Sequence, residues 1–373
     1  MTVEKNAPSS LLEPHDPLLI RDGRSFGSGE SARSLPFVPP TTLIGLIRTL
    51  HGSRSGRFDT DKDKVDALLN LSLRGPLLAE LLDGDSGFSA AGLYAPAPRD
   101  AVMPGDDESA PLHQLRPAAP HPGVLLDNDA EELWPLALSG NPKGKPGTMP
   151  QFWPWAVFGA WLLGQAVTLR GQGVRLEQSE RTHGSLNPAT GTAAEGLLFG
   201  TSALEFSGAN GQRFGLSFHT DADLPAGAVP FGGERRLSVL HPAQGPQWPA
   251  CPEQVRDEIV TTGRARILLL TPAVFTEGWK PAWLLSDPDV RPRLRAAAVG
   301  RPLTLSGWDL KAGAPKPTRR LAPEGSVYYL ELDGSPEQRK EWVDSVWLKS
   351  VSDGEQDRRD GLGLAVLGVW RDQ

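Results

Sequence analysis

The first part of the chain alternates between short apolar runs and turn-forming residues. Residues 18–20 (LLI) form an apolar run that ends at Asp22 and Gly23, which predicts a first strand and its exit. Two prolines, Pro39 and Pro40, then precede a run in which apolar residues recur at helical spacing, so we predict a helix there. The apolar residues on its face are Leu43, Leu46, Ile47 and Leu50.

The pattern then predicts a hairpin, a second helix and a last pair of strands. The hairpin has DGDSG at residues 83–87 as its turn, and prolines in its returning strand favour an edge or bulged strand. Aromatic residues between 152 and 163 predict a buried helix that begins near Pro154, and residues 175–206 supply the last strands. This β-α-β-β-α-β order is typical of a ferredoxin-like or RRM-like domain, which we place at residues 1–208.

A second set of predicted strands fills residues 209–373. These strands are β-branched or alternating, and the one helical pattern among them covers about residues 253–259. We therefore expect an α+β protein with two ferredoxin-like domains, of which the second is a degenerate copy. The predicted strands are RFGLSFHT, FGGERRLSVLH, RARILLLTPAVF, GSVYYLEL and GLGLAVLGVW.

The character of the chain changes between residues 100 and 132. This stretch holds eight acidic residues against a single arginine, Arg116, and it is rich in proline. Such a composition predicts a long surface insertion within the first domain. Its length is typical of a segment that binds a partner or is partly disordered.

The basic residues gather in a different place. We call residues 290–323 the basic stripe, because this segment carries eight lysines or arginines and one acid, Asp309, whereas the whole chain has a net charge of −7. A local reversal of sign is typical of a surface that binds a polyanion, and a solvated loop or a site for an acidic protein is the alternative. The basic residues are Arg291, Arg293, Arg295, Arg301, Lys311, Lys316, Arg319 and Arg320.

Other features of the composition narrow the class of protein. A single cysteine, Cys251, excludes a disulfide framework and a cysteine-based zinc cluster, which suits a reducing compartment. The N-terminus lacks an apolar signal region, and the longest apolar run, residues 155–163, is too short to cross a bilayer. We expect a cytoplasmic protein of two domains that does not contact a membrane.

Catalytic motifs are weak. GDSGF at residues 84–88 resembles a serine-protease loop but lies in the predicted hairpin turn, where these residues are favoured anyway. GNPKGKPG at residues 140–147 is one residue short of a phosphate-binding loop and has Pro146 where Ser or Thr should hold magnesium. The seven histidines form no metal-binding spacing. We expect no catalytic residue, no metal and no cofactor.

Glycine loops next to basic residues carry more information. In FGGERR, Gly232 and Gly233 come shortly before Arg235 and Arg236, so a backbone could approach a phosphate while the guanidinium groups pair with it. A glycine turn with two exposed arginines is the alternative. The glycine-rich sequence at residues 361–368 departs from a dinucleotide fingerprint, and it could instead lie along an RNA backbone.

RTHG at residues 181–184 is a further motif of this kind. It offers Arg181 for a phosphate and His183 for stacking on a base or for general acid catalysis. A structural role for this histidine is the alternative.

A series of motifs in order along the chain resembles the third subunit of the Cmr effector complex, a RAMP-superfamily protein of type III-B CRISPR systems that act in antiviral defence. The resemblance covers about residues 16–370. The motifs are DPLLIRDGRSF, PFVPPTTLIGLIRT, GPLL, LYAPAPRD, ERTHGSLNPATGTAAEGLLF, FGGERR, LLLTPAVFTEGW, PKPTRRLAPEGSVYYLEL and GLGLAVLGVW.

The resemblance implies a non-catalytic RNA-binding subunit with RAMP glycine-rich loops. Its implied partners are the repeat-derived 5′ handle of crRNA, the large palm-domain subunit, the backbone RAMP subunits and, indirectly, target RNA. Together with the charge pattern, it predicts a set of RNA-binding residues: Arg21, Arg24, Arg181, His183, Gly232, Gly233, Arg235, Arg236, Lys316, Arg319, Arg320, Gly361 and Gly363.

Two other functions remain open at this stage. The first is a metal-dependent RAMP endoribonuclease acting on crRNA or target RNA, with Asp22 or His183 as the active group. The second is an adaptor that binds only proteins, which would leave the basic loops unexplained.

Overall fold

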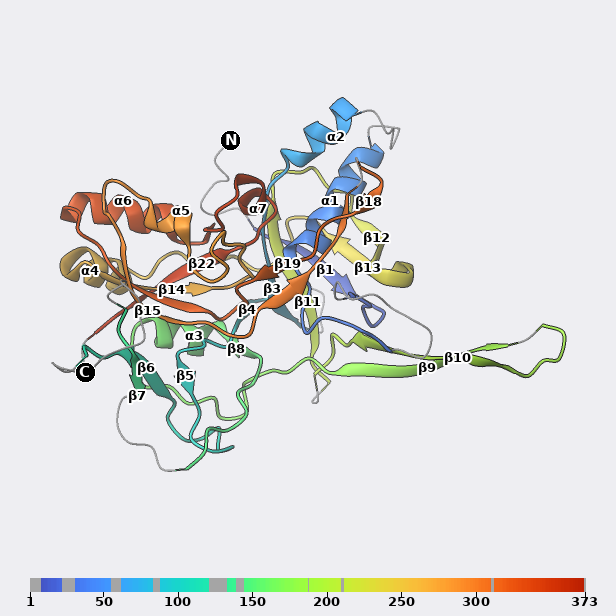
Figure 1. Ribbon diagram of the computed structural model, residues 1–373, viewed down its shortest axis with the longest axis horizontal. Helices are drawn as coiled ribbons and strands as arrows, with labels where there is room; N and C mark the ends of the chain where they lie inside the picture. Colours follow the sequence, from blue (N-terminus) through green and yellow to red (C-terminus); the bar gives the residue numbers. More distant parts are fainter. Residues whose placement is uncertain are drawn as a thin grey trace. The chain divides into compact units, whose positions relative to one another are not determined.

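A computed structural model describes residues 8–21, 31–54, 62–82, 88–120, 133–138, 144–186, 188–208, 211–309 and 312–371 (Figure 1). The chain forms two compact units, and neither is continuous in sequence. Unit 1 comprises residues 1–90, 175–247 and 304–319, and unit 2 comprises residues 91–174, 248–303 and 320–373. The expected boundary at 208/209 does not coincide with these units.

Unit 1 is built mainly from β-strands, with α-helices and a short 3-10 helix among its described residues. Its strands are β1 (Ser10–Pro14), β2 (Ser31–Arg33), β3 (Leu73–Leu81), β9 (Gln178–Leu186), β10 (Ala193–Leu204), β11 (Arg213–Thr220), β12 (Gly227–Phe231), β13 (Arg236–His241), β17 (Trp308–Asp309) and β18 (Ala314–Pro315). Its helices are α1 (Pro40–Arg54), α2 (Lys62–Leu69) and the short 3-10 helix η1 (Gly233–Arg235).

The main sheet of unit 1 has the strand order β12-β13-β1-β11-β3, and each of these neighbouring pairs is antiparallel. Helix α1 packs on β3 and buries Leu43 and Ile47, as the helical spacing predicts. The first strand is β1, however, and residues 18–20 form an extended segment beyond it. Leu18 makes an isolated bridge to Leu204 there, and its side chain is buried.

A second, smaller sheet of unit 1 contains a long hairpin. Strands β9 and β10 are antiparallel, and β2 adds to β10 in a parallel direction. Figure 1 shows the hairpin extending beyond the strands that surround its base. The RTHG motif lies on β9, as the sequence places it on one of the last strands before residue 208.

Unit 2 holds a five-stranded sheet and most of the other helices. Its strands are β5 (Ala101–Val102), β6 (His113–Pro117), β7 (Leu136–Leu138), β8 (Phe152–Pro154), β14 (Arg264–Leu269), β15 (Arg293–Ala298), β20 (Val327–Glu331), β21 (Lys349–Ser350) and β22 (Leu364–Val369). Its helices are α3 (Trp155–Leu162), α4 (Glu253–Thr262), α5 (Ala282–Leu285), α6 (Pro336–Val346) and α7 (Glu355–Arg359). Strands β4 (Phe88–Pro96), β16 (Leu303–Leu305) and β19 (Arg319–Leu321) span unit boundaries.

The sheet of unit 2 has the order β15-β20-β14-β22-β21, with antiparallel neighbours throughout. Helices α4 and α6 pack against each other and on β22 (Figure 1). Helix α3 also contacts β22, and it is the buried helix predicted after Pro154. It belongs to unit 2, although the sequence placed it in the first domain. The protein is thus a mixed α+β structure dominated by antiparallel sheets.

The described part of the acidic stretch that begins at Asp100 is anchored in unit 2 by a few buried residues. Asp100 has no exposed surface, and Met103, Leu112 and Gln114 are also buried. Strands β5, β6 and β7 form a small sheet, and β6 and β7 contact β15 of the larger one. A few buried residues, rather than the average composition, thus anchor this part of the segment in unit 2. Residues 121–132 lie outside the described residues.

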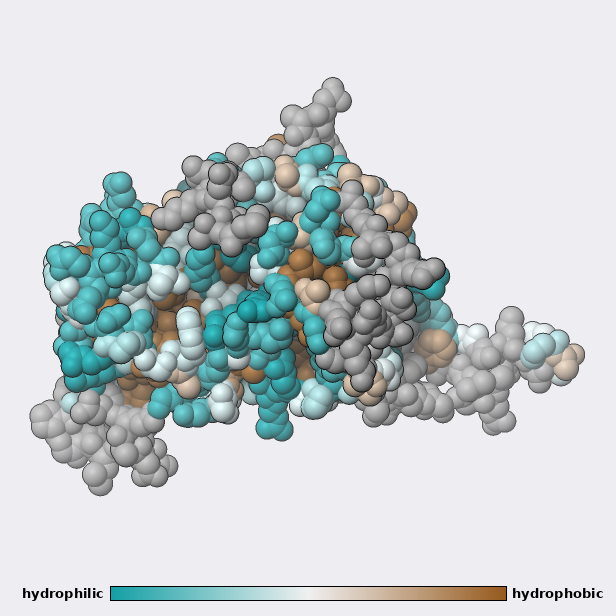
Figure 2. Space-filling model, turned by 90° about the horizontal axis from the view of Figure 1, so that it is seen from above, coloured by the Kyte–Doolittle hydropathy of each residue, from teal (hydrophilic) through white to brown (hydrophobic). Residues whose placement is uncertain are grey.

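Most of the visible surface is polar, with apolar residues reaching it in places (Figure 2). Among the described residues, the exposed large hydrophobic side chains are Leu82, Leu237, Trp279, Trp283 and Trp308. Within the described ranges, no helix has the length and apolar character needed to cross a bilayer.

Candidate RNA-binding surface

The FGGERR loop (residues 231–236) joins β12 to β13 in unit 1 and has an unusual backbone. Gly232, Glu234 and Arg235 have φ angles of 76°, 57° and 53°. Residues other than glycine adopt this left-handed region at a cost, so the surrounding structure must hold the loop. The N–H of Gly233 donates to the carbonyl of Leu19 at 2.7 Å, which fixes the loop to the segment of residues 18–20.

Asp16 provides a second anchor for this loop. Its carboxylate accepts a hydrogen bond from the backbone N–H of Leu237 at 2.7 Å. The carbonyl of Leu237 in turn accepts from the N–H groups of His15 and Asp16, at 3.0 and 3.2 Å. Sequence reasoning missed Asp16, because its partner lies 221 positions away.

The two arginines of the loop differ in their surroundings. Arg235 is exposed. The guanidinium of Arg236 pairs with Glu234 at 2.7 Å, and its Nε is buried without a hydrogen-bond partner in the described structure. The loop therefore presents the exposed guanidinium of Arg235 beside the ion pair of Arg236 and Glu234, in which the Nε of Arg236 donates to no partner in the described structure.

The predicted residue Arg21 lies two positions after Leu19, the anchor of the loop. It is exposed and forms an isolated bridge with Ser34. The hydroxyl of Ser34 donates to the carbonyl of Leu18 and accepts from the N–H of Ile20, both at 3.1 Å. The structure thus brings Arg21 and the FGGERR loop to the same segment. Arg24 and Asp22 lie outside the described residues.

Arg181 and His183 lie on β9, at the hairpin next to β2. Arg181 is exposed. The ring of His183 stacks on Phe199 with centroids 5.1 Å apart, and its Nε2 is 2.8 Å from the hydroxyl of Thr201. The histidine is therefore already engaged within the hairpin, which is the structural role left open by the sequence.

The basic stripe is less uniform than its sequence indicates. Arg291 lies 3.0 Å and Arg293 3.9 Å from the carboxylate of Asp333, and Arg295 lies 2.7 Å from that of Glu331. The two acids lie at and just after the end of β20 in unit 2, and they neutralise part of the positive charge of the stripe.

The other described basic residues of the stripe are exposed. Lys316 follows a short hairpin of β17 and β18, and its N–H donates to the carbonyl of Gly307 at 2.7 Å. Lys311 lies outside the described residues. Arg301, Lys316, Arg319 and Arg320 are exposed, as are the ion-paired Arg291 and Arg293.

Gly361 and Gly363 lie in unit 2 and are buried. Their φ angles are 85° and 82°, which favour glycine. A Cβ on Gly363 would come within 2.8 Å of the backbone nitrogen of Ser352. Packing within unit 2 is sufficient to require glycine at Gly363, and contact of this loop with RNA remains a prediction.

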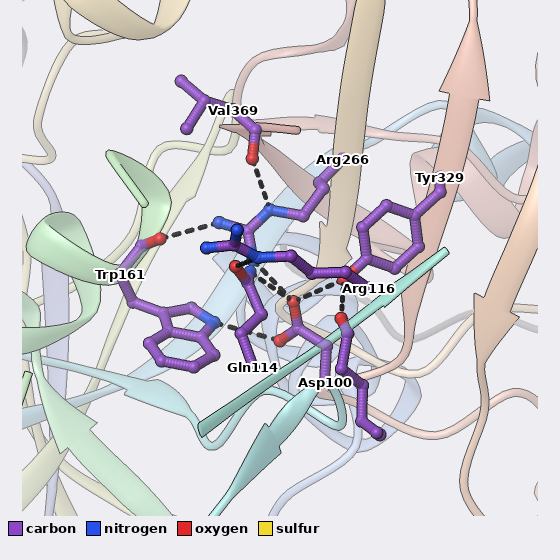
Figure 3. Close-up of polar contacts among 8 residues, drawn as sticks. Asp100, Gln114, Arg116, Trp161, Arg266, Tyr329 and Val369 are labelled. Atoms are coloured by element: carbon purple, nitrogen blue, oxygen red, sulfur yellow. Dashed lines mark hydrogen bonds and ion pairs between the residues drawn. The ribbon is translucent and has the colours of Figure 1, made fainter. Parts of the chain in front are cut away.

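A cluster of polar side chains inside unit 2 has the composition of an active site (Figure 3). The carboxylate of Asp100 pairs with Arg266 at 2.5 Å and accepts hydrogen bonds from Trp161 and Tyr329 at 3.0 Å. Burial, with the charge of Asp100, raises the pKa of Tyr329 well above its usual value. The Arg266 and Asp100 side chains have no exposed surface, so this cluster holds the fold together and has no access to a substrate.

Arg266 uses its remaining donors within the same cluster. Its Nε donates to the carbonyl of Val369 at 2.7 Å, and a terminal nitrogen donates to that of Trp161 at 2.6 Å. Across the described residues, no group of three or more His, Cys, Asp or Glu side chains is placed to hold a metal ion.

Comparison with solved structures gives remote similarities. A chain of the cryo-EM structure of the Type III-B Cmr-beta bound to cognate target RNA and AMPPnP is 16% identical over 86% of both chains, with a TM-score of 0.49. A second such structure, bound to cognate target RNA, gives the same identity and coverage and a TM-score of 0.48. A chain of the Csm3-Csm4 subcomplex of the type III-A CRISPR-Cas interference complex is 10% identical over 88% of this chain and 94% of that one, with a TM-score of 0.35. No curated protein matches the sequence.

Comparison with protein families gives a match over nearly the whole chain. Residues 10–370 match the family described as CRISPR-associated protein (Cas_Cmr3). This range includes both units and every predicted RNA-binding residue. The chain therefore belongs to the Cas_Cmr3 family of CRISPR-associated proteins, which confirms the resemblance found in the sequence.

Proposed function

We propose that this protein is the crRNA-handle-binding subunit of a type III-B Cmr effector complex, with no catalytic role of its own. Membership of the Cas_Cmr3 family supports a place in a Cmr complex. Its partners in this proposal are the 5′ handle of crRNA, the large palm-domain subunit and the backbone RAMP subunits, with target RNA contacted indirectly.

The observation that carries the RNA-binding part is the geometry of the FGGERR loop. The loop holds Arg235 exposed in a left-handed conformation, and the segment that anchors it also presents Arg21. Cationic side chains on a fixed backbone suit a phosphate chain, because charge-assisted hydrogen bonds form without further ordering of the loop. An adaptor that binds only protein would have no need for this arrangement.

The endoribonuclease alternative has less support. His183 is bonded to Thr201 and stacked on Phe199, so its ring is already engaged. The carboxylate of Asp100, which has no exposed surface, is also fully engaged.

We further propose that both units are variants of the ferredoxin-like RAMP domain. Along the chain of unit 2, α5 comes between β14 and β15, and α6 comes between β20 and β22. Within the sheet, the strand order is β15-β20-β14-β22. This order supports a β-α-β-β-α-β arrangement. In unit 1 the corresponding order is β13-β1-β11-β3, and the β12 hairpin lies where a second helix would stand. Unit 1 would then be the degenerate copy.

Substitution of the loop arginines tests the RNA-binding proposal. Arg235→Ala with Arg236→Ala should weaken crRNA binding by at least about 10- to 100-fold, since the loss of even one charge-assisted bond costs about 1.5–3 kcal/mol. Lys340→Ala, an exposed position on α6, is the control. Binding by the double variant at the wild-type level would overturn the assignment of this loop.

Two other substitutions are poor probes for structural reasons. A Cβ on Gly233 would lie 3.1 Å from the carbonyl oxygen of Leu19, so Gly233→Val would disturb the loop itself. Arg358 is unsuitable as a surface control. Its guanidinium lies 4.3 Å from the ring centre of Trp283 and donates to the carbonyls of Ser352 and Asp353.

A further inference from the structure

Unit 2 contains an open apolar cavity of about 430 Å³, which we call the tryptophan pocket. Its size falls within the range of about 300–1,000 Å³ that is usual for small-ligand sites. Small side chains of the edge strand β15 and the residue after it leave space between two tryptophans. The lining includes Trp134, Pro135, Trp279, Ala296, Ala297 and Val299.

The backbone of both tryptophans is held in place. The carbonyl of Trp279 accepts a hydrogen bond at 2.8 Å from the hydroxyl of Tyr328, whose side chain is buried. The backbone N–H of Trp134 donates to the carbonyl of Arg295 at 2.6 Å. The ring of Trp134 lies edge-on to that of Trp370, with centroids 6.3 Å apart. The side chain of Trp279 nevertheless remains 38% exposed. An exposed indole on a fixed backbone has only two side-chain torsions to order when a flat ring stacks on it, so little conformational entropy is lost.

Two arginines lie near Val299, which lines the pocket. Arg301 follows two positions later and is exposed. The guanidinium of Arg99, also an exposed residue, crosses over Gly300, where an added Cβ would lie 3.1 Å from its Nε. Glu324 interacts electrostatically with Arg99, and burial raises the pKa of this carboxyl. An anion next to an apolar slot matches this pattern of charge.

We propose that the tryptophan pocket binds one unpaired nucleobase of an RNA strand, stacked on Trp279, with an adjoining phosphate held by Arg99 and Arg301. Aromatic platforms beside cationic side chains are how proteins hold single-stranded nucleic acid. A free aromatic side chain from a partner protein would fill the slot but would leave the two arginines without a role. This inference rests on the proposed RNA-binding function.

Photo-crosslinking of the full chain to single-stranded RNA carrying 5-iodouridine tests the proposal. We expect a crosslink in a peptide that contains Trp279 or Trp134, and we expect Trp279→Ala to weaken binding roughly 5- to 100-fold. Trp279→Phe should keep most of the affinity, because a ring remains. Tyr328 bonds to the backbone of Trp279, so the anchor survives either substitution, and melting curves check that the fold is unchanged.

Trp283→Ala is the control for loss of an exposed tryptophan, because Trp283 lies in the same segment, is 42% exposed and does not line the pocket. Its ring contacts the guanidinium of Arg358, so its melting curve must be compared with that of the wild type. If the FGGERR double variant loses affinity while Trp279→Ala binds normally and no crosslink maps to the pocket, the pocket inference fails and the proposed function stands. If the wild-type chain binds no RNA, both fail. Occupation of the pocket by a side chain of a partner protein in an assembled complex would also overturn the inference.

Discussion

Asp100 and Arg266 form an ion pair in unit 2 in which neither side chain has exposed surface. The two residues lie 166 positions apart, so the pair ties the stretch after β4 to the central strand β14. Removing one partner of a buried pair leaves an uncompensated charge. We predict that Asp100→Ala lowers the free energy of unfolding by about 3–5 kcal/mol, measured by urea denaturation.

The double variant Asp100→Leu with Arg266→Met controls for the loss of charge. It should be less destabilised than Asp100→Ala alone, because both buried charges are then absent. A single variant within about 1 kcal/mol of wild type would contradict the structural role of the pair.

Gly363, in the glycine-rich sequence at residues 361–368, can be compared with Gly278, which has a similar φ angle in an open position. Their φ angles are 82° and 80°, but a Cβ on Gly363 would collide with Ser352, whereas one on Gly278 would meet nothing within 4 Å. Gly278→Ala should therefore cost about 1 kcal/mol from backbone strain, and Gly363→Ala a further ~1–3 kcal/mol from overpacking. Thermal melting measures both. Equal costs would show that close packing does not decide the choice of glycine.

Stability should depend on pH through His219 on β11. Burial, with Arg74 on the neighbouring strand, lowers the pKa of His219 from 6.5 to about 4. The unfolded chain therefore binds a proton between these values while the folded one does not. The contribution of this residue is fully present above pH 6.5 and is lost as the pH falls toward 4, by at most roughly 3 kcal/mol.

Urea denaturation at several pH values checks this prediction. His219→Gln should flatten the pH dependence between pH 4 and 6.5 relative to wild type. An unchanged slope in the variant would assign the pH dependence to other groups.

The proposed absence of catalysis is also testable. The isolated chain should cleave neither crRNA nor target RNA with or without divalent metal ions, as followed by gel electrophoresis of end-labelled RNA. Metal-dependent cutting that disappears in Asp22→Ala would instead support the endoribonuclease alternative.

Local patterns predicted local structure well. The prolines before α1 and its apolar spacing identified that helix, and Pro154 marked the start of α3. Helix α6 was missed although its signals are present, since Ser335 and Gln338 form a capping box and Pro336 is the first helical residue. Attention to capping would have found it.

Long-range relationships were beyond the reach of these patterns. Units made from separated segments leave no local mark in the sequence. The sequence therefore placed α3 in the first domain, whereas the structure places it in unit 2. The burial of Asp100 depends on Arg266, and the anchoring of the FGGERR loop depends on Asp16. In each case the partner is more than 160 positions away, and its identity emerges only from the fold.

The most direct test of the account compares two RNAs of equal length, one with the repeat-derived 5′ handle of crRNA and one without it. Filter binding of the purified chain to each RNA over a range of salt concentrations gives both affinities. We predict tighter binding of the handle RNA, with affinity that falls as salt rises, because lysine and arginine contacts to phosphates release counterions. Equal affinity for the two RNAs, or an affinity independent of salt, would contradict handle binding.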